Sequence, residues 1–268
     1  MNAERSQLPV VLAIGGHDPG GGAGIQADIE SIAANGCHAT TVVTCLTVQD
    51  SCNLSALHPV SPASVRAQIK AVMQDCPVRV IKIGLIGDPA IASDLAKFLH
   101  DHPQIPVVMD PVLAAGGGQN LATETLLDII VDQLLPRCSL ITPNSPEARR
   151  LCRSDLSLEL AARHLLEKGA KAVLITGTHE QTRQVSNRLY DVSGLLDSLE
   201  WERLPGEYHG SGCTLASAIA AGLGRGLPLR EAVRQAQSFT WRSLQQGFRS
   251  GRCQTLPNRL HAIRRLYT

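Results

Sequence analysis

Short apolar runs alternate with helical patterns along most of the chain. Runs that are apolar at nearly every position predict buried strands over residues 9–16, 38–48, 78–87, 105–112, 139–144 and 171–178. Apolar residues spaced three and four apart predict helices over residues 24–36, 61–75, 88–102, 123–135, 145–151, 211–224 and 229–247. Because helices follow the apolar runs, we expect a parallel sheet covered by helices on both faces.

One segment departs from this alternation. Residues 185–205 predict two or three antiparallel strands, which we place at an edge of the sheet. No internal repeat, linker or low-complexity segment is evident. The pattern therefore indicates one α/β domain over residues 1–268, with a central, mostly parallel sheet and a small antiparallel edge.

Composition and charge narrow the possible partners. The 268 residues are 44% hydrophobic and 18% charged, which is typical of a folded globular protein. A net charge of +1 without a basic block argues against nucleic acid and an anionic membrane surface, and an aromatic content of 3% argues against base stacking. No run approaches the ~20 apolar residues of a membrane span, and residues 1–11 contain no apolar signal segment. We therefore expect a soluble cytoplasmic protein.

The cysteines and the loop histidines do not form a metal motif. Eight cysteines are present, at positions 37, 45, 52, 76, 138, 152, 213 and 253. None forms a Cys-x-x-Cys pair and most lie inside apolar runs, so we expect reduced thiols rather than disulfides or a zinc site. His17, His179 and His209 lie in glycine-rich loops, but their spacing matches no zinc site.

The segment HGSGCT, residues 209–214, leads into a predicted apolar helix. Gly210, Ser211 and Gly212 lack bulk, so their backbone can approach a ligand closely, and the N–H groups at a helix start attract anions. These residues therefore predict an anion hole. We expect Cys213, at the helix start, to have a lowered pKa and to act as a base or as a polar group beside a transferring phosphoryl. The alternative is a small buried residue at a tight junction.

A second glycine-rich segment, GGHDPGGGAGIQAD, occupies residues 15–28 between a predicted strand and a helix. It matches neither the phosphate-binding Walker pattern nor the dinucleotide-binding fingerprint. It is therefore either a flexible turn or a ligand loop of another kind. Asp28 lies on the following helix, where its carboxylate is within reach of a polar heterocycle or a hydroxyl; the alternative is an ordinary solvated carboxylate.

Amide and carboxylate side chains at two strand ends predict a magnesium and phosphate region. Asn144 and Glu147 lie three residues apart at a strand-to-helix junction, where their oxygens can converge on a hydrated magnesium ion. The alternative is a helix cap formed by the same residues. Asp110 follows another predicted strand and is a candidate for the same region, unless it only initiates a turn.

Taken in order, these segments resemble a known family. They are GGHDPGGGAGIQAD (15–28), LTVQD (46–50), IKIGLIGD (81–88), MDPV (109–112), LITPNSPEA (140–148) and HGSGCT (209–214). The chain resembles the hydroxymethylpyrimidine kinase/phosphomethylpyrimidine kinase family of thiamin biosynthesis, in the ribokinase superfamily. The resemblance implies a ribokinase-like three-layer α/β/α sandwich. It also implies ATP-dependent phosphorylation of 4-amino-5-hydroxymethyl-2-methylpyrimidine, then of its monophosphate.

The resemblance also assigns site residues by position. The matches to the family's pyrimidine contacts are Gly16, Asp28, Gln49 and, beside the ring, Leu85. The matches to the Mg²⁺ and phosphate positions are Asn144 and Glu147, with Asp110 nearby. The matches to the anion hole are Gly210, Ser211 and Gly212, followed by Cys213 where sugar kinases of the superfamily carry a base aspartate. The positions expected to bind ATP or its phosphates are Asp110, Asn144, Thr176, Gly177, Thr178 and Gly212.

Three departures from the family pattern concern the phosphate region. Gly20 stands where many members have a serine, residues 113–120 lack a lysine that follows Asp-Pro-Val in many members, and Thr176 stands where many have a lysine. We expect the lost lysines to affect the rate and the second phosphorylation. The superfamily often forms dimers, so a homodimer is expected. The alternatives are a kinase of pyridoxal, pyridoxine or pyridoxamine, and a non-catalytic pyrimidine sensor.

Overall fold

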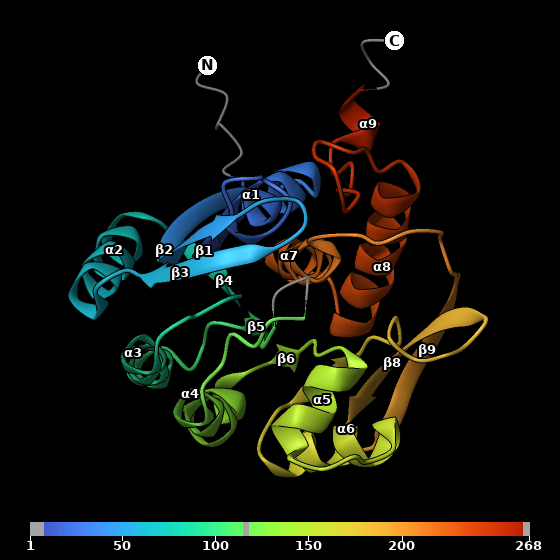
Figure 1. The fold of residues 1–268 in the computed structure, drawn as a ribbon. Helices are drawn as coiled ribbons and strands as arrows, with labels where there is room; N and C mark the ends of the chain where they lie inside the picture. The colour runs from blue at the N-terminus through green and yellow to red at the C-terminus, as the bar shows by residue number, and fades with distance from the viewer. Residues whose placement is uncertain (1–7, 115–117, 265–268) are drawn as a thin grey trace, which may run out of the picture.

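A single sheet organises the part of the chain that the structure, a computed structural model, describes: residues 8–114 and 118–264. Its strands are β1 (Val10–His17), β2 (His38–Gln49), β3 (Leu54–Pro59), β4 (Val78–Ile83), β5 (Val107–Met109), β6 (Leu140–Ile141), β7 (Ala172–Ile175), β8 (Gln184–Asp191) and β9 (Gly194–Glu202). Within these residues they lie in the order β3-β2-β1-β4-β5-β6-β7-β8-β9 (Figure 1). Two expectations lie partly outside the described residues: the absence of a signal segment, at residues 1–7, and the missing lysine of residues 113–120, at residues 115–117.

The sheet is parallel from β2 to β7 and antiparallel at both edges. The strands β2, β1, β4, β5, β6 and β7 pair in parallel, whereas β8 and β9 add antiparallel pairs at one edge. The antiparallel edge predicted over 185–205 is therefore confirmed. The other edge, β3 against β2, is also antiparallel and was not predicted. None of its six residues is buried, and its apolar residues Leu54, Ala56 and Leu57 do not alternate regularly, so the pattern gave little signal.

Helices cover both faces of the sheet, which confirms the three-layer α/β/α fold. The helices are α1 (Gly24–Ala34), α2 (Pro62–Asp75), α3 (Pro89–Asp101), α4 (Glu124–Ile129), α5 (Ser145–Cys152), α6 (Leu158–Glu167), α7 (Ser211–Gly224), α8 (Leu229–Gln245) and α9 (His261–Arg264). A π-helical turn (Ile130–Leu134) and a short 3₁₀ turn (Leu135–Arg137) continue α4. Helix α6 was not predicted. None of the described helices combines the length and apolar character that a membrane span requires.

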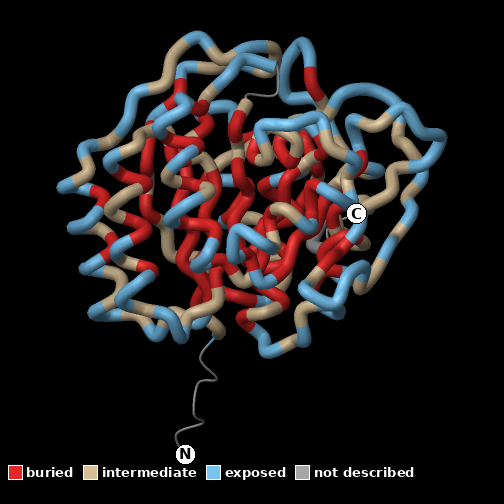
Figure 2. The backbone as a smooth tube through the Cα atoms, turned by 90° about the horizontal axis from the view of Figure 1, so that it is seen from below, coloured by how far each residue is buried: buried red, intermediate tan, exposed pale blue. Residues whose placement is uncertain are grey.

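Alternate side chains of β1 point into two separate cores, as the pleat of a strand requires. Leu12 and Ile14 pack with residues of α2 to α6, whereas Val11 and Ala13 pack with residues of α1, α7 and α8. A central strand buried on both faces explains why β1 is apolar at nearly every position. The buried backbone accordingly gathers in the middle layer, with the exposed residues on the outer helices and loops (Figure 2).

The helix starts fall into two kinds. Side chains of Ser61, Asp88, Thr123 and Ser157 accept hydrogen bonds from first-turn N–H groups of α2, α3, α4 and α6. Helices α1, α7 and α8 have no side-chain cap, and the N-cap of α7 is Gly210, whose φ of 82° lies in the left-handed region. The first-turn N–H groups of α7 are therefore left without a side-chain acceptor.

One pair of cysteines contradicts the expectation of reduced thiols. Cys52, in the turn between β2 and β3, forms a disulfide with Cys253, 201 residues further along the chain, with the two Cα atoms 5.1 Å apart. The remaining cysteines, 37, 45, 76, 138, 152 and 213, are free, as expected. Spacing along the sequence did not reveal the pair because the fold alone brings these two segments together. The backbone N–H of Gln254 donates to the Ser51 carbonyl oxygen beside the disulfide.

Candidate active site

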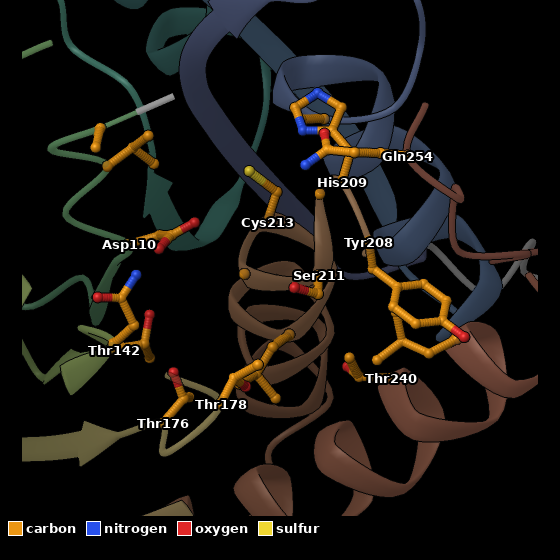
Figure 3. A pocket seen from close by; sticks show the side chains of 18 of the residues that line it. Asp110, Thr142, Thr176, Thr178, Tyr208, His209, Ser211, Cys213, Thr240 and Gln254 are labelled. Carbon is orange, nitrogen blue, oxygen red and sulfur yellow. The ribbon is translucent and has the colours of Figure 1, made fainter. Parts of the chain in front are cut away.

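A cavity of about 810 Å³ opens at the carboxyl ends of the parallel strands. Residues that follow successive strands line it: His17, Gln49, Leu85, Asp110, Thr142 and Thr176. Figure 3 shows Asp110 and Cys213 facing the same space at the start of helix α7. The glycine-rich segments and the acidic residues at the strand ends therefore gather at one edge of the sheet, where ligands of such α/β sheets bind.

The two glycine-rich segments meet in the wall of this cavity. A Cβ atom added at Gly210 would overlap the Gly22 carbonyl oxygen, so only glycine permits this approach. Asp18 accepts hydrogen bonds from the N–H groups of Gly20 (2.8 Å) and Ala23 (2.9 Å), and it pairs with His209 Nε2 at 3.1 Å. Burial raises the pKa of Asp18, but His209 and these N–H groups outweigh burial and lower it. The Asp18–His209 contact therefore ties one glycine segment to the other.

The start of α7 has the geometry expected of an anion hole. Gly210, Ser211 and Gly212 all line the cavity. A Cβ at Gly212 would lie 3.4 Å from Asp110 Oδ2, so the backbone here runs close to that carboxylate. Uncapped N–H groups and the positive end of the helix dipole favour an anion at this position. An anion held there would lie beside Asp110, which itself requires a proton or a cation nearby.

A buried ion pair lies beneath this site. Lys82 Nζ is 2.7 Å from Asp28 Oδ1, which also accepts a hydrogen bond of 2.7 Å from the Ser217 hydroxyl. Burial lowers the pKa of Lys82, but Asp28 and the other nearby acidic groups outweigh burial and raise it. Although Asp28 borders the cavity, it has no accessible surface, and neither has Lys82. Asp28 Oδ2 has no hydrogen-bond partner, and the expected contact between Asp28 and a substrate ring stays a prediction.

Two further carboxyl groups lack a matching cation. Asp110 Oδ2 is buried without a hydrogen-bond partner. Burial raises the pKa of Asp110, with Lys82 opposing the shift and Asp28 adding to it. Burial, followed by the neighbouring Asp110, raises the pKa of Glu147 to about 8. This side of the site therefore has an excess of negative charge whenever both groups are ionised.

Asn144 and Glu147 form a helix cap, as the alternative interpretation expected. Asn144 Oδ1 accepts from the Glu147 N–H at 2.9 Å, and Glu147 Oε2 accepts from the Asn144 N–H at 3.0 Å. Glu147 Oε1 accepts from the Leu113 N–H at 3.3 Å. No group of three or more His, Cys, Asp or Glu side chains is arranged to hold a metal ion in the described part of the chain. Of the three predicted metal ligands, Asp110 alone has a buried oxygen without a partner; the metal role of all three stays a prediction.

The expected lowering of the Cys213 pKa is wrong. Burial raises the pKa of this thiol to about 12, and the opposing effect of Lys82 is smaller. The helix start does not offset the loss of water because nearby Asp110 and Asp28 also disfavour a thiolate. Cys213 therefore lines the cavity with a raised pKa, and its role as a base or as a polar group stays a prediction.

Predicted ligand residues lie at separate parts of the cavity. Gly16, Gln49 and Leu85 line it near the first glycine segment, where a Cβ at Gly16 would contact the Leu85 side chain at 3.1 Å. Thr176 and Thr178 line it beyond Asp110 (Figure 3). Gly177 does not line this cavity, but its N–H donates at 3.1 Å to Oδ1 of Asn187, which does line it. The expected contact between Gly177 and a phosphate stays a prediction.

Several lining residues were missed from the sequence. Both tryptophans of the chain, Trp201 and Trp241, line the cavity, with ring centroids 6.0 Å apart. Gln237 Oε1 accepts from Trp201 Nε1 and from Asn187 Nδ2, each at 3.0 Å. Thr240 also lines this wall. The rarity of tryptophan was a signal in the composition, but only the packing of α8 against β9 brings the two rings together.

Comparison with known proteins decides the family. A family model described as phosphomethylpyrimidine kinase matches residues 18–258. The chain belongs to this family. The hydroxymethylpyrimidine/phosphomethylpyrimidine kinase of Haemophilus influenzae is 37% identical over 243 residues, which are 87% of this chain and 90% of that protein. The thiamine biosynthesis bifunctional protein ThiED of Geobacter sulfurreducens is 38% identical over 233 residues, covering 85% of this chain and 48% of that protein. This chain thus spans about half the length of the Geobacter protein.

Solved structures of family members and related kinases share the fold. An ADP complex of Bacillus subtilis pyridoxal kinase has a TM-score of 0.88 and 28% identity, and covers 96% of this chain and 99% of that one. A phosphomethylpyrimidine kinase from Clostridium difficile has a TM-score of 0.76 and 28% identity, and covers 86% of this chain and 97% of that one. The family assignment thus agrees with the ribokinase-like fold.

Proposed function

We propose that this protein is a phosphotransferase that uses ATP to phosphorylate 4-amino-5-hydroxymethyl-2-methylpyrimidine and then its monophosphate, in thiamin biosynthesis. The observation that carries the proposal is the uncapped start of α7, which adjoins Asp110 and the first glycine segment in one cavity. The names of the relatives, at 33–38% identity over most of this chain, support the substrate. One sheet running through the described residues supports a single domain.

The anion hole serves the phosphoryl transfer. The substrate alcohol must attack the γ-phosphorus in line with the leaving oxygen, so catalysis consists mainly of positioning and charge stabilisation. Backbone N–H groups of Ser211 and Gly212 are suited to receive the charge on the transferring group. Because the transition state is loose, the alcohol keeps most of its proton until late. The proton can then pass to an oxygen of the transferred phosphoryl group, so no thiolate base is needed, and a neutral Cys213 thiol can donate a hydrogen bond to that group.

Asp110, Asn144 and Glu147 are the residues that would hold Mg²⁺. When bound, the ion would neutralise the phosphate oxygens of ATP. Asp110 Oδ2 has no partner in the structure and fits a direct or water-mediated contact. The capping bonds of Asn144 and Glu147 occupy their oxygens, so we assign them to water-mediated contacts. The raised pKa of Asp110 fits a site that waits for a cation.

We assign the two parts of the cavity to the two substrates. Gly16, Gln49 and Leu85 provide a small, uncharged pocket that suits a methylpyrimidine, with Gln49 able to hydrogen-bond the ring nitrogens or the amino group. Thr176, Thr178 and the wall that contains Trp201, Gln237 and Trp241 are assigned to the nucleotide. No basic pocket is required for the pyrimidine itself. We further infer a cytoplasmic homodimer that does not bind nucleic acid.

A pyridoxal kinase is the second candidate. The structural match to the Bacillus subtilis pyridoxal kinase (TM-score 0.88) exceeds that to the Clostridium difficile phosphomethylpyrimidine kinase (0.76). Pyridoxal also carries a hydroxymethyl group on an aromatic nitrogen heterocycle, so the same cavity could orient it. The two substrates differ in the groups that Gln49 would face.

Incubation with ATP, Mg²⁺ and each heterocycle, followed by mass spectrometry, tests both candidates. The proposal expects pyrimidine monophosphate and then diphosphate. Pyrimidine monophosphate alone would restrict the function to one step and implicate the missing lysines. Turnover of pyridoxal without turnover of the pyrimidine would replace the proposal by the second candidate, and binding of the pyrimidine without any product would identify a sensor.

A further inference from the structure

Arg259, near the C-terminus, is buried between the two glycine-rich segments. Its side chain is 2% exposed, although it carries a full charge. Arginine has five N–H donors in a rigid planar fork and no acceptor, so its burial requires several well-placed acceptors. Neither the sequence motifs nor the proposed chemistry assign this residue a role.

The acceptors of Arg259 lie on both glycine-rich segments. Nη1 donates to the Gly21 carbonyl oxygen at 3.4 Å, and Nη2 donates to the Gly22 carbonyl oxygen. Nε donates to the Thr214 hydroxyl at 2.9 Å, in the first turn of α7. The Thr214 hydroxyl in turn donates to the Gly210 carbonyl oxygen at 2.8 Å. Through Thr214, one guanidinium therefore connects the first glycine segment to Gly210, the first residue of the proposed anion hole.

The charge of Arg259 has a partner on a third element. Glu30 of helix α1 lies 3.1 Å from Nη1, with its side chain 28% exposed. This ion pair balances the charge of the guanidinium, so Arg259 does not need a ligand to satisfy it. Its position is therefore fixed by the fold before any substrate binds. Breaking such a buried pair by removing one partner is costly.

The connection lies at the point where the two segments touch. The Gly22 carbonyl oxygen that accepts from Arg259 is also the atom that a Cβ at Gly210 would overlap. On the cavity side, the Asp18–His209 contact joins the same segments. The backbone N–H of His209 donates to the Thr255 carbonyl oxygen at 3.0 Å, so the segment that carries Arg259 also holds the start of the second loop.

We propose that Arg259 is a positioning residue that sets the separation of the first glycine segment from the anion hole. The proposal rests on the proposed function, because the first segment borders the pocket for the alcohol and the second receives the phosphoryl group. Phosphoryl transfer depends on the alignment of these two reactants, and a misplacement of about 1 Å can reduce the rate about 100-fold. Arg259 touches neither reactant, so it acts through the loops.

Arg259→Lys is the primary test, because it keeps the charge and removes the fork. An ammonium is a point donor and cannot span the acceptors on both segments. We expect kcat to fall roughly 10- to 100-fold, with the KM values for ATP and the heterocycle changed less than about threefold. Arg234→Lys, which alters an exposed arginine paired with Asp197, is the matched control and should leave kcat unchanged. Equal kcat for Arg259→Lys and wild type would overturn the proposal.

A second measurement keeps the inference separate from the identity of the substrate. Amide hydrogen exchange without ligands should be faster in Arg259→Lys at residues 20–24 and 209–214, and unchanged in helix α8. If Arg259→Lys does not fold, Thr214→Val replaces it in the test, because this variant removes the hydroxyl link at nearly constant volume. It should also lower kcat and speed amide exchange at residues 20–24 and 209–214. Faster exchange confined to the C-terminal segment would overturn the proposal even if the wild type proved to phosphorylate neither heterocycle. Wild-type inactivity toward both heterocycles would overturn only the proposed function.

Discussion

The buried charges of the site fall into two halves that the fold treats differently. In one half, Asp28 Oδ1 is matched by Lys82 at 2.7 Å and by the Ser217 hydroxyl, although Asp28 Oδ2 has no hydrogen-bond partner. In the other half, Asp110 has a carboxylate oxygen without a partner, and Glu147 accepts backbone N–H groups only. We call Asp28 with Lys82 the complete half, because its negative charge has a matching cation. We call Asp110 with Glu147 the incomplete half, because these carboxyl groups have no such cation.

The difference indicates that the complete half stabilises the fold, whereas the incomplete half serves the reaction. A buried carboxylate with a matching lysine stabilises the interior only if both charges are present. A buried carboxylate without a cation costs stability unless it takes up a proton or a cation, and the raised pKa values of Asp110 and Glu147 express this cost. Shifted pKa values of this kind are typical of functional sites. The incomplete half adjoins the start of α7, where Mg²⁺ would supply the missing positive charge and the helix start would face the phosphates of ATP.

The largest effect is expected from breaking the complete half. Lys82→Met should lower the free energy of unfolding by about 3–5 kcal/mol, because Asp28 then remains buried without a cation. Chemical denaturation measures this change. The double variant Lys82→Met with Asp28→Asn removes the uncompensated charge and should recover more than half of the loss. A single-variant loss below about 1 kcal/mol would contradict the assignment of this pair to structure.

Neutralising the incomplete half should affect catalysis instead. Asp110→Asn should lower kcat roughly 10²–10³-fold, the magnitude expected when one strong electrostatic contact to a transition state is lost. The free energy of unfolding should stay the same or rise, because a buried charge is removed. Steady-state kinetics and denaturation on the same preparation give both numbers. If Asp110→Asn were destabilised but fully active, Asp110 would serve the stability of the fold rather than catalysis.

The pH dependence of stability should carry the signature of Glu147. Its pKa is about 8 in the folded protein and about 4.5 when unfolded, so between these values the folded state holds a proton that the unfolded state has lost. Stability therefore falls as pH rises from about 5 to 8 without Mg²⁺, by at most about 1.4 kcal/mol per pH unit from this group. Glu147→Gln should flatten the slope. If stability depended on pH equally in the wild type and in Glu147→Gln, Glu147 would not be a buried carboxyl group without a matching cation.

The smallest effect is expected at Cys213, which borders both halves. As a neutral thiol that donates one hydrogen bond, it should contribute about tenfold to kcat, or ~1.4 kcal/mol. Cys213→Ser should retain most activity, since a hydroxyl also donates, whereas Cys213→Ala should lose it. A 10³-fold loss for Cys213→Ala, with a kcat that rises with pH toward a low pKa, would restore the thiolate base that burial argues against.

The sequence allowed the fold and the position of the site at the carboxyl ends of the strands to be predicted. It did not allow the contacts between distant segments to be predicted. Continuous apolar runs identified the central strands, and glycine segments at their carboxyl ends identified both loops. Edge strand β3 was missed because none of its residues is buried, whereas helix α6 has a clear amphipathic pattern behind the Ser157 cap and could have been predicted. Arg259, the Cys52–Cys253 disulfide and the Trp201–Trp241 wall depend on segments that lie far apart in the chain, so no local pattern encodes them. The pKa of Cys213 was mispredicted because its burial is a property of the packed site.

Calorimetry of ATP binding with and without Mg²⁺ tests the contrast between the two halves most directly. The wild-type protein should bind ATP at least about tenfold more tightly with Mg²⁺ than with a chelator, a difference of about 1.4 kcal/mol. Asp110→Asn should lose this difference while keeping its affinity for metal-free ATP. An equal Mg²⁺ dependence in the wild type and in Asp110→Asn would contradict the claim that the incomplete half is the site of the magnesium–nucleotide complex.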